Sequence, residues 1–156
     1  MNEEITQGEQ FCQQYREEIL KLTRYLPWLS SVSGNDVSKA YDGSLGKSDI
    51  SFPVFDSTLL NFVKELQKTQ FMDKNYPYAY TRRHIKTPED EIKYIDKAWL
   101  NDIDYLKAVL TKYTTEGMRK AGRWSEAVDR GLYTRVIEKL YEILMYYTSD
   151  KKTTNQ

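Results

Sequence analysis

The sequence predicts an all-α protein, an irregular bundle of about five or six helices with one long loop. Three observations support this prediction. Apolar residues recur at every third or fourth position in the long segments, which is the spacing of one helix face. Strand-like alternation is confined to one short stretch, so no large sheet is expected. The length of 156 residues suits one domain, which we place at residues 1–150, before a disordered polar tail at 151–156.

The first helix is predicted at residues 4–26. Its apolar residues are spaced by four, four, three and four, and they are Phe11, Tyr15, Ile19, Leu22 and Leu26. Pro27 predicts the end of this helix, because a proline disfavours helical geometry at the residue before it. Residues 30–52 are rich in Ser, Gly, Asn and Asp, and they predict a long loop that leads into a short extended piece at Asp49–Val54.

A second helix is predicted to begin at Asp56–Thr58 and to fade at Thr69–Asp73. Its apolar residues cover more than one stripe, which indicates a well-buried helix. Residues 75–83 then place a tyrosine at every second position, which is the period of a strand. Pro77 argues against a central strand, because a proline cannot donate to the hydrogen-bonding ladder. We therefore expect an extended connector here, or one small hairpin in which this stretch pairs with Ser51–Val54.

Thr87 and Pro88 mark a strong helix start. A threonine can cap a helix with its side-chain oxygen, and a proline suits the first helical position. The acidic residues that follow stabilise the positive end of the helix dipole. Apolar residues recur at threes and fours from Ile92 to Tyr113, and we expect Asn101 and Asp102 to divide this stretch into two helices.

The C-terminal part predicts two more helices. A short one covers Trp124–Arg130 and is closed by Gly131, and the last one runs from about Leu132 to Tyr147. Tyr141 and Tyr146 lie off the apolar side of the last helix. Exposed aromatic area of this kind predicts a surface for self-association or for another protein.

Composition excludes several functions. The 23 Lys and Arg residues balance 23 Asp and Glu residues, whereas a dedicated nucleic-acid binder usually carries a basic excess. Cys12 is the only cysteine and His84 the only histidine, so an internal disulfide and a cysteine-based zinc site are excluded. We expect no metal and no cofactor. The acidic start, MNEEITQGEQ, is unlike a signal peptide, and no apolar run approaches the ~18 residues of a membrane span, so we expect a soluble cytoplasmic protein.

The stretch NYPYAYTRRHIK at residues 75–86 is the main candidate for a binding surface. Tyrosines can stack on bases and arginines can hold phosphates, so nucleic acid is one possible ligand. The candidate residues of this stretch are Tyr78, Tyr80, Arg82, Arg83 and His84. We favour the alternative that the tyrosines pack inward while Arg82 and Arg83 pair with the acids at Glu89–Glu91, which makes the stretch a structural joint.

Two single residues are also candidates. His84 could serve as a general base, but no Cys, Ser or Asp adjoins it in the sequence, so we name no catalytic residue. Trp124 could anchor a partner, or it could fill the core beside Gly122 and Gly131. We therefore expect a non-catalytic helical interaction module that binds itself or another protein. A nucleic-acid-associated protein from a mobile element and an enzyme with a site near His84 are the alternatives.

Several pieces, in this order, resemble a family of small bacterial proteins labelled domain of unknown function 6508. They are Tyr25-Leu26-Pro27, the helix start at Phe55-Asp56-Ser57 and the segment Gly122–Gly131 before the last helix. The resemblance covers about Leu22–Leu144 and implies a compact helical bacterial domain. It implies no activity, and no catalytic residue is carried over from it.

Overall fold

The computed structural model describes the backbone of residues 3–31, 38–41, 52–55, 57–120 and 122–154, and the side chains of 7–31, 57–120 and 122–148. This part of the chain is a helical bundle, as predicted, but it contains eight α-helices, more than the five or six expected. The helices are α1 (Glu3–Thr23), α2 (Leu26–Ser31), α4 (Ser57–Gln67), α5 (Tyr76–Arg82), α6 (Pro88–Lys97), α7 (Ile103–Gly117), α8 (Gly122–Asp129) and α9 (Leu132–Thr154).

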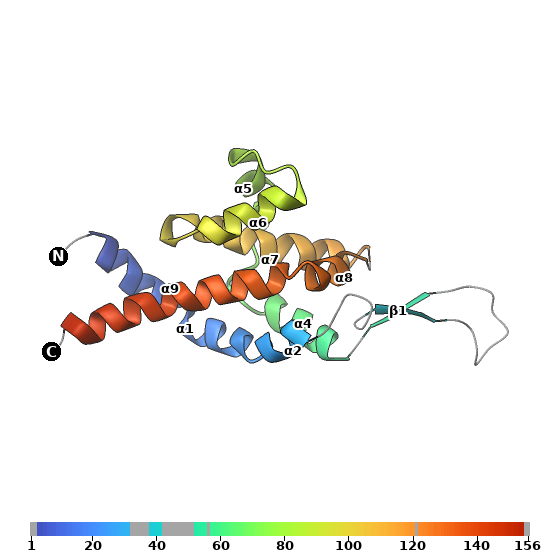
Figure 1. Cartoon of the computed structure of the whole chain (residues 1–156), viewed down its shortest axis with the longest axis horizontal. Helices are drawn as coiled ribbons and strands as arrows, with labels where there is room; N and C mark the ends of the chain where they lie inside the picture. Colours follow the sequence, from blue (N-terminus) through green and yellow to red (C-terminus); the bar gives the residue numbers. More distant parts are fainter. Residues whose placement is uncertain (1–2, 32–37, 42–51, 56, 121, 155–156) are drawn as a thin grey trace.

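The bundle has three tiers (Figure 1). Helices α7, α8 and α9 form the middle tier and contact one another. Helices α5 and α6 lie on one side, where α5 packs on α7 and α6 packs on α9. Helices α1, α2 and α4 lie on the other side, and α1 runs along α9. The two longest helices are therefore paired, and α7 is enclosed from both sides.

A two-stranded antiparallel sheet projects from one end of the bundle (Figure 1). Strand β1 (Ser38–Tyr41) pairs with β2 (Phe52–Phe55), so that Ser38 faces Phe55 and Tyr41 faces Phe52. Both strands fall in or beside the stretch predicted as a long loop, and α2 also reaches into that stretch. The rest of the predicted loop, residues 32–37 and 42–51, lies outside the described residues.

The core follows the apolar stripes that the sequence predicts for the long helices. Tyr15 of α1 stacks on Phe71, with 5.0 Å between ring centroids, and Phe62 of α4 meets the Tyr133 ring of α9 edge-on, also at 5.0 Å. The buried side of α9 consists of Leu132, Tyr133, Val136, Ile137, Leu140, Ile143, Leu144 and Tyr147. Among the described residues, no helix is long and apolar enough to cross a membrane.

Two close helix contacts depend on glycine. A Cβ atom added at Gly117, the last residue of α7, would overlap the indole ring of Trp124 in α8. A Cβ atom added at Gly8 of α1 would likewise overlap the ring of Tyr147 in α9. In both places an aromatic ring occupies the space where a side chain of the facing helix would stand.

The predicted extended connector or hairpin at residues 75–83 is wrong, because Tyr76–Arg82 form helix α5, and β2 pairs with β1 instead. Helix α2 was also missed. Pro77 and Pro27 each stand at the second residue of their helix, where a proline is well tolerated because the N–H groups of the first turn have no partner within the helix. Pro27 predicted the end of a helix although it opens α2, and the alternate tyrosines at residues 76–80 predicted extended backbone although they belong to α5.

Helix α5 ends in a Schellman motif around His84. The backbone N–H of Ile85 donates to the carbonyl of Tyr80 at 3.1 Å, and the N–H of His84 donates to the carbonyl of Thr81 at 3.1 Å. His84 takes the left-handed position after the helix, with φ = 57°, which usually falls to glycine. Ile85 is buried beside it. His84 thus has a backbone role that its sequence neighbours do not indicate.

The predicted start of α6 is confirmed as a complete capping box. The Oγ1 atom of Thr87 accepts from the N–H of Asp90 at 3.1 Å, and a carboxylate oxygen of Asp90 accepts from the N–H of Thr87 at 3.2 Å. Hydrogen bonds from the N–H groups of Lys86 and Thr87 hold the pKa of Asp90 below its ordinary value. The predicted division at Asp102 is also confirmed, because the 3₁₀ helix η1 (Leu100–Asp102) separates α6 from α7.

Helix α9 continues to Thr154, beyond the predicted end at Tyr147. It therefore enters residues 151–156, where we expected a disordered tail; residues 155–156 lie outside the described ones. The stretch from Thr148 to Thr154 contains neither glycine nor proline, so nothing in its sequence interrupts the helical hydrogen-bonding ladder.

Replacing His84 with glycine should stabilise the protein. Glycine adopts the left-handed conformation without the clash of about 1–2 kcal/mol that a Cβ atom introduces. We expect His84→Gly to raise the free energy of unfolding by about 1 kcal/mol in urea titrations, whereas His84→Ala, which keeps the Cβ atom, should give no gain. A loss of stability in His84→Gly would show that the imidazole itself supports the fold.

Candidate functional site

The buried carboxylate of Glu91 in α6 lies where α5, α6, α7 and the end of α8 meet. Its side chain is only 4% exposed, although it belongs to the first turns of α6. The hydroxyl of Tyr80 donates to it at 2.7 Å, and the hydroxyl of Tyr113 donates to both of its oxygens, at 2.8 and 3.0 Å. The hydroxyl of Tyr105 donates to the Glu91 backbone carbonyl at 3.0 Å. Three helices are thereby joined at one residue.

Two cations balance this buried charge. The Nζ atom of Lys112 lies 3.7 Å from Glu91 and 4.6 Å from the centre of the Tyr80 ring. The guanidinium of Arg130, just after α8, lies 4.0 Å from Glu91 and bonds Glu126 at 2.9 Å. Burying a charge is costly unless it is paired and hydrogen-bonded, and Glu91 is both.

The phenols around Glu91 are held in their neutral form. Burial, and then the negative charge of Glu91, raise the pKa values of Tyr80, Tyr105 and Tyr113 well above the ordinary 10.0. Hydrogen bonds to the carboxylate add to this for Tyr80 and Tyr113, since a phenol must keep its proton in order to donate it. These tyrosines are therefore donors at neutral pH and not bases.

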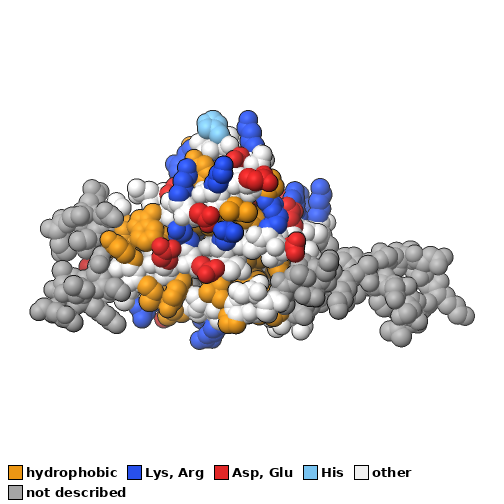
Figure 2. Space-filling view, viewed as in Figure 1, with side chains coloured by type: hydrophobic (Ala, Val, Ile, Leu, Met, Phe, Trp, Pro, Cys, Tyr) orange, Lys and Arg blue, Asp and Glu red, His pale blue; other side chains and the backbone are white. Residues whose placement is uncertain are grey.

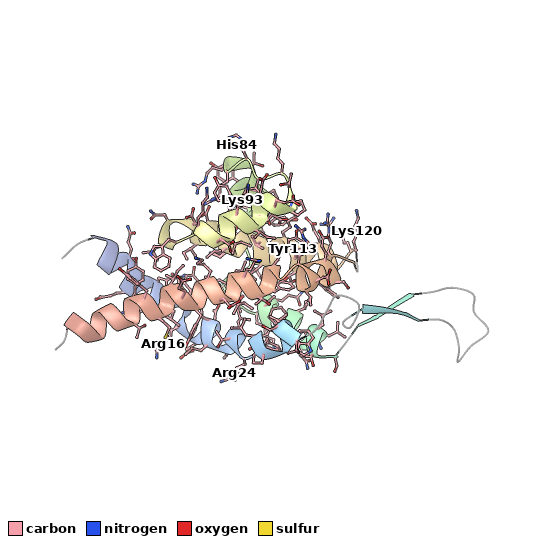
Figure 3. The ribbon with its side chains drawn as sticks, viewed as in Figure 1. Arg16, Arg24, His84, Lys93, Tyr113 and Lys120 are labelled. Atoms are coloured by element: carbon pink, nitrogen blue, oxygen red, sulfur yellow. The ribbon has the colours of Figure 1, made fainter. Side chains whose placement is uncertain are left out.

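A polar cleft of about 190 Å³ opens beside Glu91. It is lined by residues of α5, the α5–α6 connection, α6, α7 and α8, and Figure 3 labels Tyr113, which is one of them. The charged residues on its walls are Lys86, Glu91, Lys112, Arg123 and Glu126. Clefts that combine convergent polar groups with shifted pKa values are the usual place to seek a binding site. No cluster of three or more metal-ligating side chains occurs in the part of the chain that the structure describes.

The structure gives Arg83 a structural role, but with partners other than those we expected. The guanidinium is nearly buried and bonds Asp104 with two nitrogens, at 2.7 and 3.0 Å, and Asp102 at 3.2 Å. Burial is the largest single influence on the pKa of Asp104 and raises it, but the hydrogen bonds and charge of Arg83, the charge of Arg82 and a bond from the N–H of Tyr105 together lower it below its ordinary value. Arg82 also bonds Asp104, at 3.2 Å, from an exposed position. The expected pairing with Glu89–Glu91 is wrong, because the end of α5 faces the start of α7.

The other candidate residues do not share one surface. Tyr78 is 66% exposed, whereas Tyr80 points inward to Glu91. His84 stands exposed at the apex of the molecule (Figures 2 and 3) and is not among the residues that line the cleft. Trp124 is buried against Gly117, and its indole N–H donates to the carbonyl of Thr114 at 3.3 Å. Of the two roles considered for Trp124, the core role fits this position.

A second candidate surface is an aromatic cluster of Trp99, Tyr146 and Tyr147. The rings of Trp99 and Tyr146 meet edge-on at 5.4 Å, and those of Tyr146 and Tyr147 at 4.9 Å. The indole N–H of Trp99 donates to the hydroxyl of Tyr147 at 3.2 Å, which fixes the indole. Tyr146 is 49% exposed, as its position off the apolar line predicted. Hydrophobic side chains reach the surface in this part of the molecule, where the α6–α7 connection lies beside α9 (Figure 2).

Sequence reasoning missed the role of Glu91, although a signal was present. Glu91 lies four residues before Ile95 and seven before Ala98, and all three are buried. A glutamate on the buried stripe of an amphipathic helix must find partners, so this position alone indicates a polar site. Its partners Tyr80, Lys112 and Tyr113 come from other helices, and no local pattern connects them to Glu91.

Removing the buried carboxylate should destabilise the fold. Glu91→Ala leaves two buried hydroxyls and two cations without their acceptor, and loss of one partner from a buried pair typically costs about 3–5 kcal/mol. Glu89 provides the control, because it is an exposed acid in the same helical turn, and Glu89→Ala should cost less than about 1 kcal/mol. Urea unfolding compares the two variants, and equal losses would show that Glu91 has no special role.

The buried phenols predict alkaline unfolding. Below pH 10 the tyrosines are neutral in both the folded and the unfolded chain, so their stabilising contribution is complete. Above this pH the unfolded chain loses protons that the fold retains, and each raised tyrosine costs ~1.4 kcal/mol per pH unit. We expect tyrosinate absorbance to reach its full value only together with loss of helical circular dichroism. Complete ionisation in a folded protein would contradict this.

Comparisons with models of protein families, with curated proteins and with solved structures found no match. The resemblance to domain of unknown function 6508 therefore stays a prediction, and the geometry of the chain itself must support any functional assignment.

Proposed function

We propose that the protein is a non-catalytic helical interaction module that self-associates through the aromatic cluster of Trp99, Tyr146 and Tyr147. The observation that carries the proposal is the position of Tyr146, which is almost half exposed although two neighbouring rings hold it in place. Tyrosine and tryptophan dominate the binding energy of many interfaces. A ring that is already fixed loses little conformational freedom on binding.

The charges around the cluster suit a two-fold symmetric contact. Arg135 pairs with Asp96 at 3.2 Å, and Lys139 lies 3.5 Å from Glu142 and 5.9 Å from the centre of the Trp99 ring. Lys139 and Glu142 therefore bring both signs of charge to the edge of the aromatic cluster. In a symmetric dimer the same patch meets itself, so a border of mixed charge can pair opposite signs across the interface.

The alternative functions have less support. Nucleic-acid binding by residues 75–86 would need the guanidinium of Arg83, which two aspartates already hold in a nearly buried position. An enzyme site near His84 would need oriented partners, whereas a helix C-terminus accounts for the backbone conformation of that residue.

Sedimentation equilibrium over a range of protein concentrations tests the proposal. Tyr146→Ser should weaken self-association by about tenfold or more, since an interface tyrosine of this kind often contributes over 1 kcal/mol. The matched control is Tyr78→Ser, which removes an exposed tyrosine from α5, outside the aromatic cluster, and should leave self-association unchanged. A wild-type protein that stays monomeric at all concentrations, or equal effects of the two substitutions, would refute the proposal.

A further inference from the structure

A second cavity adjoins the Glu91 cleft. It has a volume of about 330 Å³ and lies over the end of α7 and the start of α8. Its walls are Tyr76, Glu116, Arg119, Lys120 and Arg123. Arg123 also lines the Glu91 cleft, so the two cavities share one guanidinium as a common wall. Lys120 marks this region in Figure 3, on the side of the molecule opposite Arg24.

The walls of the two cavities are basic, although the chain as a whole is neutral. Five cationic residues line them, and they are Lys86, Lys112, Arg119, Lys120 and Arg123. Three acids line the same walls, and they are Glu91, Glu116 and Glu126. The whole sequence carries 23 residues of each sign, so this local excess of positive charge is a property of the fold and not of the composition.

The three acids are already engaged within the protein. Glu91 accepts from two tyrosine hydroxyls. Glu116 and Glu126 both bind Arg123, at 3.1 and 2.9 Å, and Glu126 also binds Arg130 at 2.9 Å. These bonds fix the Arg123 side chain between the two cavities, and its hydrogen bond to Glu126, which outweighs the cost of burial, raises the pKa of Arg123.

Three cations are left without an acidic partner among the described residues. Lys86, Arg119 and Lys120 are exposed, and no ion pair joins them to any described side chain. Lys112 is partly exposed and shares Glu91 with Arg130. A concave site with low-dielectric walls and unpaired cations concentrates negative ligands, because its walls focus the electric field.

We propose that the two cavities together bind a ligand that carries two neighbouring phosphate groups. One phosphate would lie in the Glu91 cleft near Lys86 and Lys112, and the other near Arg119 and Lys120, with Arg123 between them. The cleft of about 190 Å³ is many times the ~10–15 Å³ of such cavity space that one water molecule needs, so it has room for a phosphate group. The ring of Tyr76 forms one wall of the second cavity and offers a surface for an organic portion of the ligand. The two phosphates can come from a small diphosphate or from the backbone of a single-stranded nucleic acid.

Isothermal titration calorimetry at low ionic strength tests the proposal with two probes, inorganic pyrophosphate and a short single-stranded oligonucleotide. Arg119→Gln with Lys120→Gln should weaken binding by about tenfold or more, because two direct phosphate contacts are lost. The matched control is Lys21→Gln with Arg24→Gln, which removes the same charge from two exposed residues at the end of α1. Arg24 lies on the other side of the molecule in Figure 3. This control should change affinity by less than about twofold.

The outcomes separate the sources of the phosphates. Binding of pyrophosphate that depends on Arg119 and Lys120 supports a small diphosphate as the ligand, and binding of the oligonucleotide alone supports a nucleic-acid backbone. No binding of either probe, or equal loss in the two double variants, would overturn the proposal. A second measurement uses the unmodified protein, in which amide NMR shifts on addition of the probe should concentrate at residues 86–91 and 112–123. Shifts spread evenly over the surface would also overturn it.

Discussion

The buried carboxylate of Glu91 is the interaction on which one whole side of the bundle depends. It receives hydroxyls from α5 and α7 while it sits on α6, and the cation of Arg130 reaches it from the end of α8. A seven-residue helix such as α5 has no stability of its own in water. It keeps its place because Tyr80 binds Glu91 at one point and Arg83 binds the start of α7 at another.

This polar joint also explains why the neighbouring cleft is basic. A buried carboxylate requires nearby cations, and Lys112 and Arg130 supply them. Glu126 pairs with both Arg123 and Arg130, so its carboxylate is not available to neutralise the other cations of the cleft. The charge of the cavity walls is therefore a consequence of how the helices are joined. The aromatic cluster, in contrast, lies at the junction of the α6–α7 connection with α9 and involves none of these residues.

Sequence periodicity predicted the helices that carry a long apolar stripe, and capping chemistry predicted the start of α6. It failed for α2, because a proline near a helix start has the same local appearance as a proline that ends a helix. It failed for α5, because tyrosines at every second position have the period of a strand although the segment is too short to show a helical period. It also failed for the partners of Arg83, since Asp102 and Asp104 come closer in space than the acids that are nearer in the sequence. The cleft could not be predicted, because its walls come from residues between Tyr80 and Glu126 that only the packing of α5 to α8 brings together.

The two glycines that face aromatic rings limit how the bundle can move. Sliding α1 along α9 by one helical turn, about 5.4 Å, would replace Gly8 at this contact with a residue whose Cβ atom would meet the Tyr147 ring, and the same holds for Gly117 of α7 against Trp124 of α8. A shift of either helix pair by a whole turn is therefore sterically opposed. We expect any rearrangement that accompanies ligand binding or association to keep the α1–α9 and α7–α8 contacts in register, and to use the connections between helices instead.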